Sequence, residues 1–294
     1  MLFSGNFLPL HLEIDGNNSP NSIILKATMQ KFFLSALLAL MLSSCGEYQR
    51  VQKSDDYAYK FDFAKRAYEE KRYVQAATIL KDCITVFKGS DKAEESLFLL
   101  GMSHYENKDY LTAGSYLKAY YQRYPKGKYT EDARFYTGYG YYLDSPEPQL
   151  DQSGTIKAIE ELQGFLDFFP RSDRGSIAQN AIFELQDKLT LKQLQNAQLY
   201  YNLGNYMGNN FESCVIVARN AIKDYPYSKY KEDLELLILK ARYQEANMSI
   251  DERKADRFRE VVDEYYSFTN NYPDSPHRQE AENIYKIARK YVNE

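Results

Sequence analysis

The sequence contains no tryptophan and few of the residues from which metal, redox or catalytic sites are built. Three cysteines and three histidines are spread over 294 residues: Cys45, Cys83, Cys214, His11, His104 and His277. They form no CxxC pair and lack the spacing of a metal-binding motif. The glycine-rich phosphate loop, the GxSxG elbow and the HExxH string are also absent. We therefore predict that the chain holds no metal and no cofactor, and that it is not an enzyme.

Neither sign of charge dominates the sequence. Lys and Arg number 37, Asp and Glu number 41, and the formal net charge is −4 with both signs mixed throughout. Nucleic-acid-binding chains usually carry a concentrated positive face, so no nucleic-acid partner is predicted. Hydrophobic residues make up 44% of the chain, which is enough for a core. The 28 tyrosines suit surfaces that are apolar in body and hydrogen-bonding at the tip.

A phenylalanine, a small residue and a tyrosine recur together at an interval of 37 residues. The aligned sets are Phe61, Phe98 and Phe135; Ala64, Gly101 and Gly138; and Tyr68, Tyr105 and Tyr142. A fixed period with small residues between aromatics is typical of helical repeats that stack on their neighbours. The pattern predicts an all-α, tetratricopeptide-repeat-like superhelical solenoid of about five helical hairpins plus a C-terminal capping helix.

Proline marks the end of the second helix in the predicted hairpins. An aromatic-Pro-x-small string recurs at 124–127, 169–172, 225–228 and 272–275. Proline stops a helix because it has no backbone N–H to donate. The four occurrences therefore indicate one repeated unit.

Other local signals set the expected limits of individual helices. Ser90 and Thr130 are predicted to cap the helices that follow them, and Pro276 is expected at the first position of the last helix. The turn of the third hairpin carries an insertion at 144–148, and a long helix is predicted over 176–203.

The amino-terminal part resembles a lipoprotein signal. Residues 1–28 have loop composition, and we expect them to be a mis-called extension, with Met29 as the true start in place of Met1. A basic start and a short apolar run over 29–44 lead to Leu-Ser-Ser-Cys, which resembles a bacterial lipobox with Cys45 as the lipidated residue. Several acyl chains, palmitate among them, would anchor the protein, because one chain binds membranes only marginally. The alternative is a plain secretory signal with an incidental cysteine. Residues 45–56 are predicted to be a lipidated tether.

One face of the first helix in each early repeat is aromatic. Its members, which we call the aromatic ladder, are Phe61, Tyr68, Phe98, Met102, Tyr105, Phe135, Tyr139 and Tyr142. Residues seven apart share a helix face, so each pair of rings points the same way. Two interpretations remain open: the rings pack helix against helix between repeats, or they form a trough that binds a peptide with apolar side chains.

The remaining cysteines and His104 are interpreted as packing residues. Cys83 and Cys214 fall at core positions of the second helix in their hairpins. A disulfide between them is not expected, because distant repeats of a solenoid do not touch. His104 has no Ser, Asp or Cys partner in helical register, so we expect it to face the core.

With these features together, the chain resembles the BamD family over roughly 45–290. That family is the lipoprotein subunit of the β-barrel assembly (BAM) machinery of the bacterial outer membrane. The resemblance implies a protein on the periplasmic face of that membrane. It implies that repeats 1–3 (57–175) bind the C-terminal segments of unfolded outer-membrane proteins. It further implies that repeats 4–5 and the capping helix (176–294) dock the periplasmic POTRA domains of the barrel-forming subunit.

The sequence departs from the family pattern in two places. It has no proline after the second helix of repeat one, and it has an additional stretch at 207–210. Two other functions stay open on the sequence alone. One is a glycan-binding nutrient-uptake lipoprotein of the outer membrane, against which the missing tryptophan counts. The other is a periplasmic repeat scaffold for envelope or cell-wall growth.

Overall fold

The computed structural model describes residues 46–292, and this part of the chain is helical without a β-strand. The segments 1–28 and 29–44 and the predicted anchor Cys45 lie outside the described residues. The helices are α2 (Tyr57–Glu69), α3 (Tyr73–Val86), α4 (Asp91–Glu106), α5 (Tyr110–Arg123), α6 (Thr130–Leu143), α7 (Ser153–Phe168), α8 (Gly175–Leu203), α9 (Asn210–Asp224), α10 (Lys231–Asn247), α11 (Asp251–Asn271) and α12 (Arg278–Val292). Within 46–292 no helix is both long and apolar enough to cross a membrane.

The chain divides into two units between Phe63 and Ala64. In the described part of the first unit, residues 46–53 are helical and α2 then begins. Asp56 caps α2, because its carboxylate accepts hydrogen bonds at 3.0 Å from the backbone N–H groups of Ala58 and Tyr59. Tyr48 stacks on the fully buried Phe63, with 6.1 Å between ring centroids.

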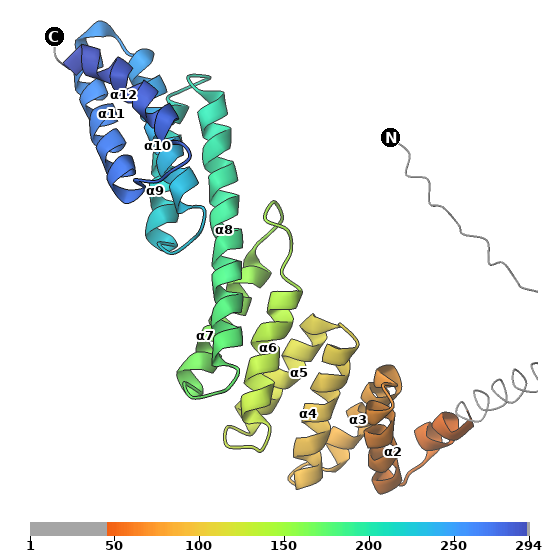
Figure 1. Cartoon of the computed structure of the whole chain (residues 1–294). Helices are drawn as coiled ribbons and strands as arrows, with labels where there is room; N and C mark the ends of the chain where they lie inside the picture. The colour runs from red at the N-terminus through yellow and green to blue at the C-terminus, as the bar shows by residue number, and fades with distance from the viewer. Residues whose placement is uncertain (1–45, 293–294) are drawn as a thin grey trace, which may run out of the picture. The chain divides into compact units, whose positions relative to one another are not determined.

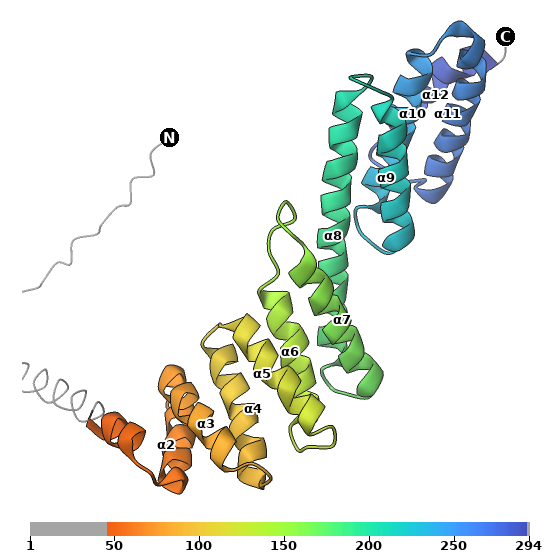
Figure 2. The same cartoon turned by 180° about the vertical axis from the view of Figure 1, so that it is seen from behind.

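From Ala64 onward the helices form successive hairpins, as the 37-residue period predicts. Each helix from α3 to α12 packs on the next helix along the chain, and Figures 1 and 2 show these hairpins following one another. The first helices of neighbouring hairpins also contact each other, from α4 to α6, α8, α10 and α12 in turn. We call these five helices the helix-A row. The predicted tetratricopeptide-like repeat fold is confirmed.

Two of the aligned glycines let the helices of a hairpin approach closely. A Cβ atom added to Gly101 would lie 2.7 Å from the side chain of Leu117. A Cβ atom on Gly138 would lie 2.9 Å from both the side chain and the backbone nitrogen of Leu162. Only glycine therefore fits these crossings, which explains why small residues recur there.

Each aromatic-Pro-x-small exit is held by a carboxylate from an earlier helix of the row. At the first exit, Glu94 accepts hydrogen bonds from the Tyr120 hydroxyl at 2.6 Å and from the Lys128 N–H at 2.8 Å. Further along, Ser172 donates to Glu131 at 2.6 Å and Ser228 donates to Asp187 at 2.7 Å. At the last exit, Asn271 and Tyr272 donate to Glu235 at 2.9 and 3.3 Å. These contacts tie consecutive repeats together.

The structure corrects three predictions about helix starts. Ser90 does precede α4, but its hydroxyl donates backward to the Phe87 carbonyl and makes no cap bond. Thr130 is already the first residue of α6, and its hydroxyl donates to the Tyr124 carbonyl. Pro276 lies in the turn before α12, where the Ser275 hydroxyl accepts from the N–H of the residue after the proline. For Ser90 and Thr130, a carbonyl of the preceding turn competes for the hydroxyl.

Candidate peptide-binding face

The aromatic ladder divides into buried and accessible residues. Phe98, Met102 and Phe135 are 9%, 5% and 4% exposed, so they belong to the core. Tyr105, Tyr139 and Tyr142 are half-buried, as is Tyr68. Phe61, in the first unit, is buried.

The buried members follow the packing interpretation. Phe98 stacks on Tyr129 at 4.4 Å between ring centroids. Phe135 packs against Phe165 at 5.4 Å. The two phenylalanines lie in different core clusters, and Tyr136 packs against both clusters, directly against the Phe135 ring in one. Rings 37 residues apart are therefore linked through an intermediate tyrosine.

Tyr105 packs α4 against α6. Its ring lies 4.8 Å from that of Tyr136 and 5.3 Å from that of Tyr110, and a Cβ atom on Gly140 would be 3.5 Å from it. Burial raises the pKa of the Tyr105 hydroxyl well above its ordinary value. The same cause raises the pKa of Tyr68 to about 12.

Tyr139 and Tyr142 continue the ladder to a hollow beside α8. Their rings lie 5.1 Å apart, and the Tyr142 hydroxyl donates to Glu184 at 2.5 Å. That hydrogen bond, with burial as a second cause, raises the pKa of Tyr142 to about 12. Tyr142 lines a cavity of about 570 Å³ bounded by α6, the insertion after it, α8 and the start of α10.

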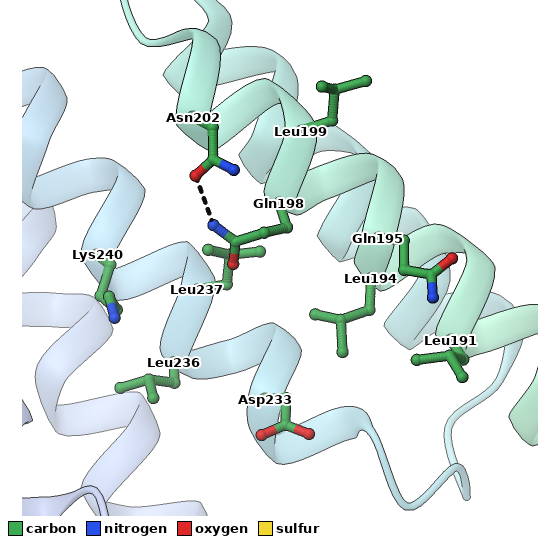
Figure 3. A pocket seen from close by; sticks show the side chains of 10 residues that line it. All are labelled: Leu191, Leu194, Gln195, Gln198, Leu199, Asn202, Asp233, Leu236, Leu237 and Lys240. Carbon is green, nitrogen blue, oxygen red and sulfur yellow. Dashed lines mark hydrogen bonds between the residues drawn. The ribbon is translucent and has the colours of Figure 1, made fainter. Parts of the chain in front are cut away.

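A second cavity, of about 580 Å³, lies between α8 and α10 (Figure 3). Its lining is Leu191, Leu194, Gln195, Gln198, Leu199, Asn202, Asp233, Leu236, Leu237 and Lys240. Leu191 lines both cavities, so the two hollows adjoin along α8. We call the two cavities together the α8 groove. It lies on the helix-A row and begins at Tyr142.

The wall of the second cavity combines leucines with side-chain amides. The Gln198 amide donates to the Asn202 side-chain oxygen at 2.9 Å, and Figure 3 shows this bond among the leucine side chains of the lining. The lining has two charged residues, Asp233 and Lys240, and the Lys240 ammonium pairs with Glu280 at 2.8 Å. Amide groups both donate and accept hydrogen bonds, as the unpaired backbone of an extended chain does. Such a wall suits an uncharged strand with alternating apolar side chains.

Two charged residues of the first cavity, Lys188 and Asp187, hold the fold. The Lys188 ammonium donates to the carbonyl and the hydroxyl of Ser145, at 3.1 and 2.8 Å, and so fixes the insertion to α8. Asp187 holds the exit at Ser228 and pairs with the Lys229 ammonium at 3.5 Å. The described residues contain no group of His, Cys, Asp and Glu that could hold a metal ion.

His104 is half-buried and packs through its ring, and its polar partner lies outside helical register. His104 does have a partner: its Nδ1 lies 3.0 Å from Asp109, and its ring stacks on Tyr116. Asp109 caps α5, and the chain reversal before that helix brings it back to His104, outside helical register. Cys83 and Cys214 are buried, as expected, and burial raises the pKa of the Cys214 thiol to about 12.

The leucines of the α8 groove were not identified from the sequence. Leu191 and Leu199 are eight residues apart and share a face of α8. That face differs from the core face, which contains Leu185, Leu189 and Ala197. A helix that packs on one side needs only one apolar stripe. The second apolar stripe on this long helix was therefore the sequence signal that could have indicated the groove.

Comparison with known proteins places the chain in a family. A family described as outer membrane lipoprotein, YfiO, matches residues 52–209, which is more than half of the chain. The match covers α2 to α8, and α9 to α12 follow it. A search of curated proteins gave no match. Given the repeat fold and the extent of this match, the chain belongs to the YfiO family of outer membrane lipoproteins, the BamD family.

Proposed function

We propose that this outer membrane lipoprotein is a non-catalytic scaffold that receives unfolded β-barrel proteins and presents them to the barrel-forming subunit. The C-terminal segments of the client proteins bind along the helix-A row, from Tyr139 and Tyr142 into the α8 groove. The anchor is a lipid on Cys45, and the repeats face the periplasm. The observation that carries the proposal is the continuity between the accessible tyrosines and a leucine-lined groove in a chain of this family.

The chemistry of the groove fits such a client. A barrel strand alternates apolar and polar side chains, and its backbone is unpaired until the barrel forms. A terminal aromatic ring can stack on Tyr139 or Tyr142. Upstream apolar side chains then fit against Leu191 and Leu236, while Gln198 bonds the backbone. The proposed site includes residues from both predicted halves, the substrate-binding half (57–175) and the docking half (176–294).

Exposed turns near the C-terminal hairpins support the docking role. Tyr206 and Met207 are 69% and 90% exposed after α8, and Ile250 is 66% exposed after α10. The Asn205 amide lies 3.3 Å from the Met248 sulfur, so the two turns adjoin. We propose that this apolar surface binds the POTRA domains of the barrel-forming subunit. Replacing Met207 and Ile250 by Asp should then reduce co-purification of that subunit from solubilised outer membranes.

Peptide binding tests the client site directly. Fluorescence anisotropy would compare a labelled C-terminal strand peptide of an outer-membrane β-barrel protein with a scrambled peptide. Tyr142→Ala combined with Leu199→Ala should weaken binding of the native peptide about tenfold or more, in line with the loss of two apolar contacts. Tyr227→Ala removes a ring that is 85% exposed at an exit turn outside the groove, and should leave binding unchanged.

A thermal melt followed by circular dichroism would show that both variants remain folded. The proposal fails if the folded groove variant binds the native peptide as tightly as the parent chain does. It also fails if the scrambled peptide binds equally well, because the groove would then lack the alternation on which the argument depends.

A further inference from the structure

Arg134 on α6 is held between two aromatic rings. Its guanidinium carbon lies 4.2 Å from the ring centroid of Tyr121 and 3.7 Å from that of Phe168. Its Nε is buried without a hydrogen bond. No ion pair or hydrogen bond to Arg134 occurs among residues 46–292. A half-buried arginine of this kind is unusual, because buried donors are nearly always paired.

A second arginine in the same chain shows what Arg134 lacks. Arg174 also lies over two rings, 5.2 Å from that of Phe135 and 5.4 Å from that of Tyr136. In that case the guanidinium donates to the Asp132 carboxylate. A stacked guanidinium exposes its edge as a planar fork, which matches a carboxylate. Arg134 has the two rings but no carboxylate from its own chain.

The carboxylate that bonds the Tyr121 hydroxyl is already engaged on both oxygens. Glu161 accepts from the Lys118 ammonium on one oxygen at 2.6 Å and from the Tyr121 hydroxyl on the other at 2.7 Å. Lys157 lies over the neighbouring ring of Tyr141 and adds positive charge to this surface. Glu160 is the exposed carboxylate next to Glu161. The cluster therefore keeps a fixed, unpaired cation at its centre.

The site is accessible from outside the fold. Phe168 is at the last position of α7 and is 65% exposed, so a partner can reach its outer face. Arg134 lies where α6 packs between α5 and α7. None of Arg134, Tyr121 and Phe168 lines the α8 groove. An exposed ring beside an unpaired guanidinium suits an acidic side chain next to an apolar one.

We propose that Arg134 is the receptor for a carboxylate on a partner protein, in a segment where an Asp or Glu adjoins an apolar residue. The carboxylate binds the edge of the guanidinium, and the apolar neighbour covers Phe168. A carboxylate with an apolar neighbour fits the guanidinium fork and the exposed Phe168 ring together, whereas a phosphate would leave that ring uncovered. This site does not depend on the client function of the α8 groove.

Nuclear magnetic resonance of the full chain, labelled with ¹⁵N-arginine, tests the assignment. The probe is the dipeptide acetyl-Phe-Glu-amide, with acetyl-Phe-Gln-amide as its uncharged match. The Nε–Hε resonance of Arg134 should shift saturably with the Glu peptide, in the millimolar range expected for so small a ligand. The affinity for the Gln peptide should be lower by about tenfold or more, because hydrogen bonds to a charged partner are lost.

Two controls separate binding from packing. Arg174 is already paired with Asp132, so its resonance should not move. Arg134→Lys keeps the charge but not the fork, and should weaken the Glu peptide about tenfold as followed on the peptide's own signals. Phe168→Ala removes the exposed ring that stacks on Arg134, so as a further variant it should remain folded and should also weaken the Glu peptide.

Three results would overturn the proposal. One is an Arg134 resonance that no peptide shifts. Another is an equal shift with the Gln peptide, which would reflect ring contact alone. The third is a stronger response to inorganic phosphate than to the Glu peptide, which would make the site a phosphate or lipid-headgroup site.

Discussion

The helix-A row changes character between α6 and α8. On α4 and α6 it carries tyrosines whose rings pack between repeats, such as Tyr105 against Tyr136. On α8 and α10 it carries leucines and amides around an open cavity. The two parts belong to one repeat architecture, and the second leaves a hollow of about 580 Å³ between α8 and α10.

The difference teaches how aromatic and aliphatic residues divide structural and binding roles. Large rings fill the space between repeats, as the Tyr105 ring does against Tyr136 and beside Gly140. Along α8 the leucines are shorter, and the space between α8 and α10 stays partly unfilled. Close packing thus holds the row together at one end, while the looser part remains available to a ligand.

The largest expected effect is a loss of packing in the aromatic part. Phe165 is fully buried and contacts Phe135, so Phe165→Ala should lower the free energy of unfolding by about 3–5 kcal/mol. Leu191→Ala, at a cavity wall, should cost clearly less. Urea denaturation followed by circular dichroism would measure both, and equal losses would remove the distinction between the two parts.

A smaller loss of stability is expected from adding a methyl group where helices α6 and α7 cross. Gly138→Ala places a Cβ atom 2.9 Å from the backbone of Leu162, and overpacking of this kind should destabilise by about 1–3 kcal/mol. The matched change Gly164→Ala on α7 meets nothing within 4 Å. It should stabilise by about 0.5–1 kcal/mol, because alanine favours the helix. A stable Gly138→Ala variant would contradict the close approach.

The aliphatic part should show the opposite behaviour, with binding affected more than stability. Leu199 is 57% exposed, so Leu199→Ala should change the unfolding free energy by no more than about 0.5 kcal/mol. Affinity for the client peptide should fall about fivefold, which corresponds to about 1 kcal/mol. Anisotropy and urea denaturation on the same sample would separate the two quantities.

The smallest effect on stability comes from the titration of a tyrosine hydroxyl, and it can be measured only at alkaline pH. The folded pKa of Tyr142 is raised to about 12, first by its hydrogen bond to Glu184, whereas an unfolded tyrosine titrates near about 10. The unfolded chain loses its proton first, so this stabilisation is complete below about pH 10 and is lost as pH rises toward about 12. Tyr142→Phe should make the fall in urea midpoint over this window shallower than in the parent chain. An unchanged slope would contradict the assignment.

The sequence predicted the features that depend on local chemistry. The 37-residue period identified the hairpins because Gly101 and Gly138 are required where helices cross, and the prolines marked the exits because they end helices. The carboxylates that hold those exits were missed, since Glu94 and Lys128 are 34 residues apart and no local spacing joins them. The groove was missed because a leucine stripe does not itself show whether the facing helix fills it. The sequence also left open whether Phe98 and Phe135 are buried, because their burial depends on tertiary packing.

Site-specific crosslinking measures the central claim most directly. A benzoylphenylalanine would be placed at position 142 or 199 in the groove and, as a control, at position 111, where Leu111 is exposed on α5. With the C-terminal strand peptide of a β-barrel protein as probe, we expect crosslinks from 142 and 199 but not from 111. Equal crosslinking from 111, or none from either groove position, would contradict client binding along the helix-A row.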